Sequence, residues 1–201
     1  MIEKQHYRHR SIRLAEFDYS LPGAYFITVV THGRACVFGE IGENVMILNE
    51  FGNIVKDEWQ KTPLIRPTVG LGAFVVMPNH VHAIVHILEE PIISNIVTTH
   101  SAPNTVEAYS YTPLPRPNVS ETNNVGFYSP SRTVGAFVRG FKGSVTKRIN
   151  ELRALPGAPV WQRNYYEHII RPDEDYLRIE KYIYDNPLNW LKDEENPFQT
   201  R

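Results

Sequence analysis

Two apolar runs in the middle of the chain constrain its fold more than any other sequence feature. Residues 69–77 and 80–88 are rich in β-branched and aliphatic side chains, and they meet at Met77-Pro78-Asn79. Two strand-like runs with so short a connection predict an antiparallel hairpin. Because the fixed φ of proline does not suit the usual two-residue hairpin turns, we expect the connection to be longer than it looks.

The rest of the sequence alternates between strand and helix patterns. Further strands are predicted at 24–31 and 165–170, and a short hairpin at 36–47. Apolar residues recur every three or four positions at 48–61 and again after Ser131, a candidate N-cap, and Pro172-Asp173 opens a last helix that Pro187 ends. The order strand, helix, strand, strand, helix, strand, helix predicts an α+β fold.

Length and composition favour one folded domain. The chain has 201 residues, 42% of them hydrophobic and 21% charged, as in a soluble globular protein. Residues 89–130 contain six prolines and no sustained periodicity, so we expect a surface insertion within a single domain at 1–190, followed by a C-terminal tail at 191–201. No apolar run approaches the roughly 20 residues of a membrane-spanning helix, and no signal-peptide pattern opens the chain. These patterns predict a cytoplasmic protein without a membrane partner.

Cysteine and charge limit the kinds of site. The single cysteine, Cys36, excludes an internal disulfide and a zinc site made of thiolates, so a metal must be held by histidine, carboxylate or amide groups. The net charge is −1, but residues 131–155 hold six bases and one acid, and the first fourteen residues are also basic. These two stretches are a candidate footprint for a polyanion, although lysine and arginine also serve solubility. The candidate residues for binding a nucleic acid are Arg8, Arg10, Arg13, Arg132, Arg139, Lys142, Lys147 and Arg148.

The pair His80 and His82 opens one of the predicted strands. Side chains two positions apart on a strand point to the same face, so both imidazoles could bind one divalent ion. Partly buried histidines bonded to their neighbours are the alternative. His86 shares this face, but four residues of strand separate it from His82 by about 13 Å, too far for the same ion.

Tyr182 lies at the margin of the apolar stripe of the last predicted helix, and Asn186 lies one turn further on the same side. A tyrosine phenol can attack a phosphodiester if a metal polarises the phosphate and a nearby group assists its deprotonation. The alternative interpretation is that Tyr182 only packs and that Asn186 ends the helix.

Three motifs in this order resemble a known family. The segments 77–82 (MPNHVH), 161–171 (WQRNYYEHIIR) and 182–187 (YIYDNP) are similar to those of the single-tyrosine HUH transposases, particularly the REP-associated tyrosine transposases, and residues 18–26 fit the same group. The resemblance covers about 1–88 and 131–190 and does not include the proline-rich insertion.

The resemblance implies a ferredoxin-like fold, with an antiparallel sheet and helices packed on one face. It implies single-stranded DNA beside a hairpin as substrate, and Mg²⁺ or Mn²⁺ as cofactor. His80, His82 and Asn186 become metal ligands, and Tyr182 becomes the nucleophile of a transesterification that leaves a 5′-phosphotyrosine and a free 3′-hydroxyl. The basic stretches would follow the DNA backbone. A monomer and a homodimer both stay open.

Other functions compete with this one. Metal-dependent hydrolases on eight-stranded barrels also use two histidines in this spacing, but such barrels need about 250 residues. A DNA-binding protein that keeps the fold without cutting is the alternative from another class. Competing nucleophiles are Tyr165, Tyr166 and Tyr184, the last of which lies about 200° around the helix from Tyr182.

Overall fold

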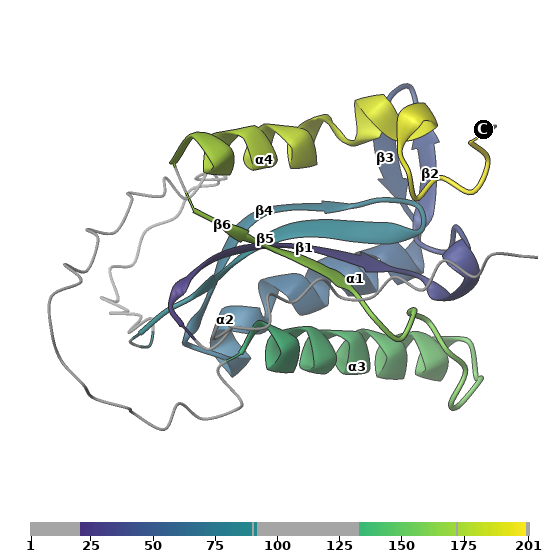
Figure 1. Cartoon of the computed structure of the whole chain (residues 1–201). Coiled ribbons are helices and arrows are strands. Elements are labelled where there is room, and N and C mark those ends of the chain that lie inside the picture. Colours follow the sequence, from purple (N-terminus) through teal and green to yellow (C-terminus); the bar gives the residue numbers. More distant parts are fainter. Residues whose placement is uncertain (1–20, 90, 92–132, 172, 200–201) are drawn as a thin grey trace, which may run out of the picture.

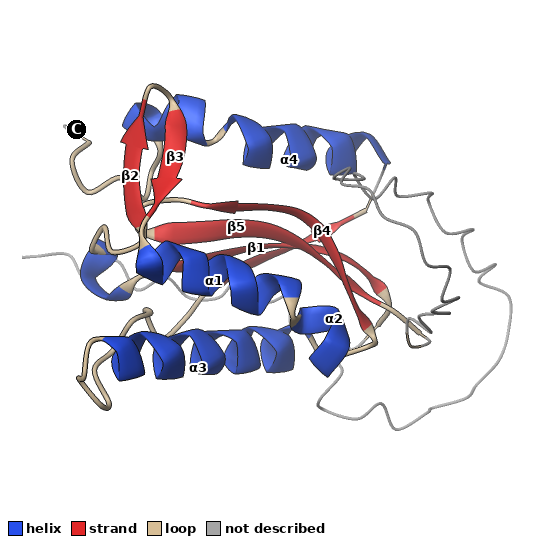
Figure 2. Ribbon diagram, turned by 180° about the vertical axis from the view of Figure 1, so that it is seen from behind, coloured by secondary structure: helices blue, strands red, loops and turns tan. Residues whose placement is uncertain are grey.

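A four-stranded antiparallel sheet forms the centre of the computed structural model, which describes residues 21–89, 91, 133–171 and 173–199 (Figures 1 and 2). From one edge to the other, its strands are β4 (Val69–Val76), β5 (His80–Ile87), β1 (Gly23–Val30) and β6 (Tyr166–Ile170). A separate hairpin joins β2 (Gly39–Gly42) and β3 (Val45–Leu48). The predicted strands and both predicted hairpins are confirmed.

Helices fill the connections between these strands. The helical segments are η1 (His32–Arg34), α1 (Glu50–Gln60), α2 (Thr62–Ile65), α3 (Val134–Leu152), α4 (Asp173–Asp185) and η3 (Pro187–Lys192). The order β1–α1–β4–β5–α3–β6, with β5 between β4 and β1, is the ferredoxin-like split βαβ arrangement. The α+β class and the antiparallel sheet are therefore confirmed.

Helices cover both faces of the sheet, whereas the family resemblance implied helices on one face only. The crossover helices α1 and α3 lie on one face, and α4 lies on the other (Figure 1). The strands bury side chains toward both faces: Val81 and Val85 of β5 belong to the main core, while Ile84 packs with Ile179 and Ile183 of α4 in a second cluster. The one-sided prediction holds for the crossover helices and fails for α4, which follows the last strand.

Two local predictions are wrong. Met77 N donates to His80 O at 2.8 Å, so only Pro78-Asn79 lie beyond the last hydrogen-bonded pair of β4 and β5, and the connection is not longer than it looks. The backbone amides of Phe38 and Thr31 donate to Pro78 O and Asn79 O and stabilise this turn. The N-cap of α3 is Thr133, whose hydroxyl accepts from Ala136 N at 3.1 Å, whereas Ser131 lies outside the described residues. Threonine at this position satisfies a free amide of the first turn just as serine would.

Candidate active site

The two histidines of β5 point toward α4, as the alternation of the strand predicts. Their Nε2 atoms lie 3.0 Å apart, and both side chains are buried. Burial, and then the neighbouring His82, lowers the pKa of His80, so its imidazole is neutral near pH 7. Neutral imidazoles are the form that binds metal ions.

Hydrogen bonds orient each imidazole through its other nitrogen. Asn79 Nδ2 donates to Arg34 O at 3.1 Å and to Glu195 O at 2.6 Å. Because both its protons are used, Asn79 Oδ1 must accept from His80 Nδ1, which lies 2.8 Å away. His80 Nε2 therefore carries a lone pair directed at His82. On the other side, Thr28 Oγ1 contacts His82 Nδ1 at 2.8 Å.

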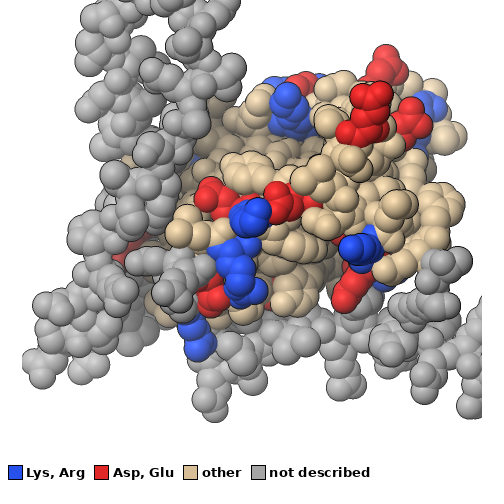
Figure 3. Space-filling model, turned by 90° about the horizontal axis from the view of Figure 1, so that it is seen from above, with Lys and Arg blue, Asp and Glu red and all other residues tan. Residues whose placement is uncertain are grey.

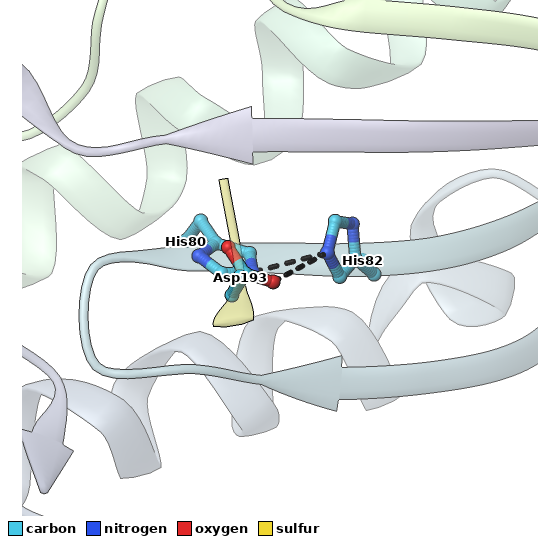
Figure 4. A group of neighbouring side chains, drawn as sticks. All are labelled: His80, His82 and Asp193. Atoms are coloured by element: carbon cyan, nitrogen blue, oxygen red, sulfur yellow. Dashed lines mark hydrogen bonds and ion pairs between the residues drawn. The ribbon is translucent and has the colours of Figure 1, made fainter. Parts of the chain in front are cut away.

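Asp193 completes a group that could hold a metal ion. Its Oδ2 lies 3.8 Å from His80 Nε2 and 4.0 Å from His82 Nε2, and Figure 4 shows it beside both rings. Burial raises the pKa of Asp193, but the contact with His82 and the hydrogen bond from the backbone amide of Glu195 oppose this, and the pKa falls below its ordinary value. Two adjacent ligands of an octahedral ion at about 2.1 Å lie about 3 Å apart, as the imidazole nitrogens do. The spacing and the donor types fit a divalent ion.

The hydroxyl of Tyr182 lies 3.2 Å from His82 Nε2, so α4 and β5 bring the phenol to the imidazole pair. Phe26 packs against both rings, with centroids 5.4 Å from His82 and 6.0 Å from Tyr182. Burial and then the charge of Asp193 raise the pKa of Tyr182 to about 12, and a hydrogen bond with Asn186 opposes this rise. With 47% of its surface exposed, Tyr182 is also open to a substrate.

Asn186 lies beside the same group and is only 1% exposed. Its Oδ1 is one of two buried side-chain polar atoms in the described part of the chain that have no hydrogen-bond partner. An unpaired buried oxygen normally costs about 1–3 kcal/mol, which makes it a candidate ligand beside the two histidines and Asp193. Sequence reasoning placed Asn186 here, and its role as a ligand stays a prediction.

The other tyrosines have different surroundings. Tyr165 donates to Glu167 Oε2 at 2.6 Å, and 60% of the surface of Tyr184 is exposed. Tyr166 lies in the edge strand β6, with its ring edge-on to Phe26. In the described part of the chain, the tyrosine hydroxyl that contacts the imidazole pair is that of Tyr182.

The predicted DNA-binding residues fall into two groups. Arg8, Arg10, Arg13 and Arg132 lie outside the described residues. Arg139, Lys142, Lys147 and Arg148 lie on α3, on the sheet face opposite Tyr182, where Arg139, Lys142 and Lys147 line a groove of about 900 Å³.

Three of these α3 bases have intramolecular partners, since Lys147 also lies 3.9 Å from Glu151 on the exposed face of the same helix. Lys142 Nζ donates to the carbonyls of residues 162–164, the nearest at 2.5 Å, and Arg148 pairs with Asp57 and Glu58 of α1. A DNA role for Arg139, Lys142, Lys147 and Arg148 stays a prediction. On the face that carries α4, acidic and basic side chains are interspersed (Figure 3).

Sequence reasoning missed Asp193 and the two residues that orient the imidazoles. Asp193 falls within 191–201, the predicted tail, yet it is buried, because η3 turns the chain back toward β5. Asn79 stands directly before His80, but its amide contacts depend on backbone that is distant in sequence. His86, which the sequence analysis placed too far from His82 for the same ion, has its Nε2 3.3 Å from the hydroxyl of Tyr176.

Comparisons with known proteins add the following. No family model matches the chain. An uncharacterized protein of Haemophilus influenzae is 39% identical over 189 residues, which cover 94% of this chain and 93% of that protein. A solved REP-associated tyrosine transposase bound to a REP hairpin is 19% identical, with a TM-score of 0.45 over 96% of this chain and 77% of its own. A candidate transposase from Deinococcus radiodurans is 16% identical, with a TM-score of 0.43 over 82% and 91%.

None of the described helices is long and apolar enough to cross a membrane.

Proposed function

The chain belongs to one family with the Haemophilus influenzae protein, and we propose that it is a metal-dependent single-strand DNA endonuclease and strand transferase with Tyr182 as nucleophile. One observation carries the proposal: the Tyr182 hydroxyl lies 3.2 Å from His82 Nε2, beside two imidazoles and a carboxylate in metal-ligand spacing. A phenol has no structural need for such a neighbourhood, whereas phosphoryl transfer needs a nucleophile next to a strong positive charge.

The residues divide the chemistry among them. The Tyr182 oxygen attacks phosphorus, the bond from phosphorus to the 3′-oxygen breaks, and a 5′-phosphotyrosine and a free 3′-hydroxyl result. The reverse attack by a 3′-hydroxyl rejoins a strand and releases the phenol. With a pKa of about 12, Tyr182 rests protonated, and the hydrogen bond from Asn186 favours the phenolate that attack requires.

His80, His82 and Asp193 would hold a divalent ion, with Asn186 as a further candidate ligand. When bound, the ion supplies Lewis-acid polarisation of the phosphate and neutralises charge. The buried carboxylate of Asp193 alone would repel a phosphodiester, and a bound cation would offset its charge. Mixed imidazole and carboxylate ligands suit Mn²⁺, and Mg²⁺ is the other expected ion.

The substrate class rests on the sequence motifs. The segments 77–82, 161–171 and 182–187 resemble those of REP-associated tyrosine transposases. We therefore propose single-stranded DNA next to a hairpin as the substrate, and transposition or processing of repeated hairpin elements as the process.

Formation of a covalent adduct tests the proposal. The protein is incubated with end-labelled single-stranded DNA that carries hairpins recovered by crosslinking in cells, with Mg²⁺ or Mn²⁺, and the products are separated under denaturing conditions. We expect an adduct that is lost in Tyr182→Phe and in His82→Ala and retained in Tyr184→Phe, the matched control on the same helix. Mixing the Tyr182→Phe and His82→Ala variants restores the adduct only if Tyr182 acts across a dimer.

Two outcomes would overturn the proposal in different ways. An adduct that persists in Tyr182→Phe and disappears in Tyr165→Phe or Tyr166→Phe shows that another tyrosine is the nucleophile. Binding of the DNA without an adduct under either ion shows a non-cleaving DNA-binding protein that keeps the fold.

A further inference from the structure

Next to the Tyr182 site, part of the same sheet face presents three rings, of which one is partly buried and two are exposed. The residues are Phe26 of β1 and Tyr166 and His168 of β6, which we call the β1–β6 shelf. The helix α4 packs mainly over β4 and β5, and this leaves Tyr166 48% exposed and His168 exposed as well. An exposed tyrosine ring on an uncovered sheet face is a surface on which a flat ligand can stack.

The shelf is continuous with the candidate active site. In the sheet register, Tyr166 pairs with Thr28, and Thr28 pairs with His82, so one row runs from the exposed edge to the imidazole. Phe26 links the parts: its ring is stacked on His82 at 5.4 Å and is edge-on to Tyr166 at 6.2 Å. With strands about 4.8 Å apart, Tyr166 stands about 10 Å from His82 along this row, the span of one or two nucleotides.

The charge on the shelf suits a nucleic acid. The strand β1 has no acidic residue, and the one acid of β6, Glu167, alternates to the other face, where it is buried and accepts a bond from Tyr165. On the described surface of these two strands, a phosphate therefore meets no carboxylate, and His168 offers a polar edge.

We propose that the β1–β6 shelf is a nucleobase-stacking subsite, with Tyr166 as the ring that stacks on a base one or two nucleotides from the phosphate held at Tyr182. The inference rests on the proposed function and adds to it the position of the single strand, which crosses β1 and β6. Stacking on a tyrosine accepts any base, so the subsite holds the strand without reading its sequence.

Equilibrium binding without cleavage tests the subsite. Fluorescein-labelled oligo(dT) of about 20 nucleotides is titrated with the whole chain in EDTA and followed by anisotropy, beside an equally long probe with abasic positions. We expect Tyr166→Ser to weaken oligo(dT) binding by about tenfold, since stacking contributes about 1–3 kcal/mol per base and 1.4 kcal/mol is tenfold. Tyr166→Phe keeps the ring and should keep the affinity. Tyr184→Ser, which removes an exposed tyrosine of α4 outside the shelf, should bind as the unchanged chain does.

The outcomes separate this inference from the proposed function. If Tyr166→Ser binds oligo(dT) as tightly as the unchanged chain, or loses affinity equally for the abasic probe, the shelf does not stack on bases. If the unchanged chain does not bind oligo(dT) at all, the subsite is likewise refuted. Failure of the covalent adduct together with Tyr166-dependent binding would reject strand cleavage and leave the subsite standing.

Discussion

Removal of the Asn79 side chain should weaken metal binding without removing a ligand. In Asn79→Ala, His80 Nδ1–H loses its acceptor, and the carbonyls of Arg34 and Glu195 lose their donors, at bond lengths of 2.8, 3.1 and 2.6 Å. His80 is then free to carry its proton on Nε2, where it blocks the lone pair that a cation needs. We expect Mn²⁺ affinity to fall by about 10–100-fold, the usual effect of losing a group that orients a ligand.

The same change should lower the free energy of unfolding by about 3 kcal/mol, at about 1 kcal/mol for each of the three hydrogen bonds, one of them buried and two partly buried. Mn²⁺ binding is measured by titration calorimetry, and folding by circular dichroism under the same conditions. Asn53→Ala is the matched control, because Asn53 makes an exposed bond within α1, far from the site. A folded Asn79→Ala protein with the Mn²⁺ affinity of the unchanged chain would refute the assigned proton position and its role.

Three further predictions follow from individual side chains. Asp193→Asn keeps an oxygen for Glu195 N, which is 2.7 Å from Oδ1, but loses the charge, so Mn²⁺ affinity by calorimetry should fall by at least about tenfold; no change would exclude Asp193 as a ligand. Burial lowers the pKa of His86 from 6.5 to about 4, so the unfolded chain takes up its proton first as the pH falls, and stability is lost between these values. Between about pH 8 and pH 5 the stability lost through His86 is about 2 kcal/mol. Urea unfolding at both pH values should show this loss in the unchanged chain but not in His86→Gln. An equal loss in that variant would contradict the linkage. Arg148→Ala should reduce stability in urea by no more than about 1 kcal/mol, since its ion pairs with α1 are partly exposed; a clearly larger loss would contradict this estimate.

The fold followed from patterns of residues close in sequence, and the site followed only in part. Alternation in β5 and the spacing in α4 put His80, His82 and Tyr182 on facing surfaces, because strand and helix periods determine which face a side chain occupies. Asp193 could not be found in this way, because its position depends on how η3 turns and on the bond between Asn79 and Glu195 O. Nor does a helical period show whether a lysine or arginine meets solvent or a neighbouring carbonyl, as Lys142 does.

Neighbouring residues of β5 face opposite sides of the sheet. Val81 and Val85 pack in the main hydrophobic core, whereas His80 and His82 lie on the face that carries Tyr182. A shift of β5 by one residue against β1 would place valines next to Tyr182 and would bury the histidine side chains in the hydrophobic core. Burial of these valines in the hydrophobic core therefore fixes the register of β5, and the same register keeps the two histidine nitrogens next to each other.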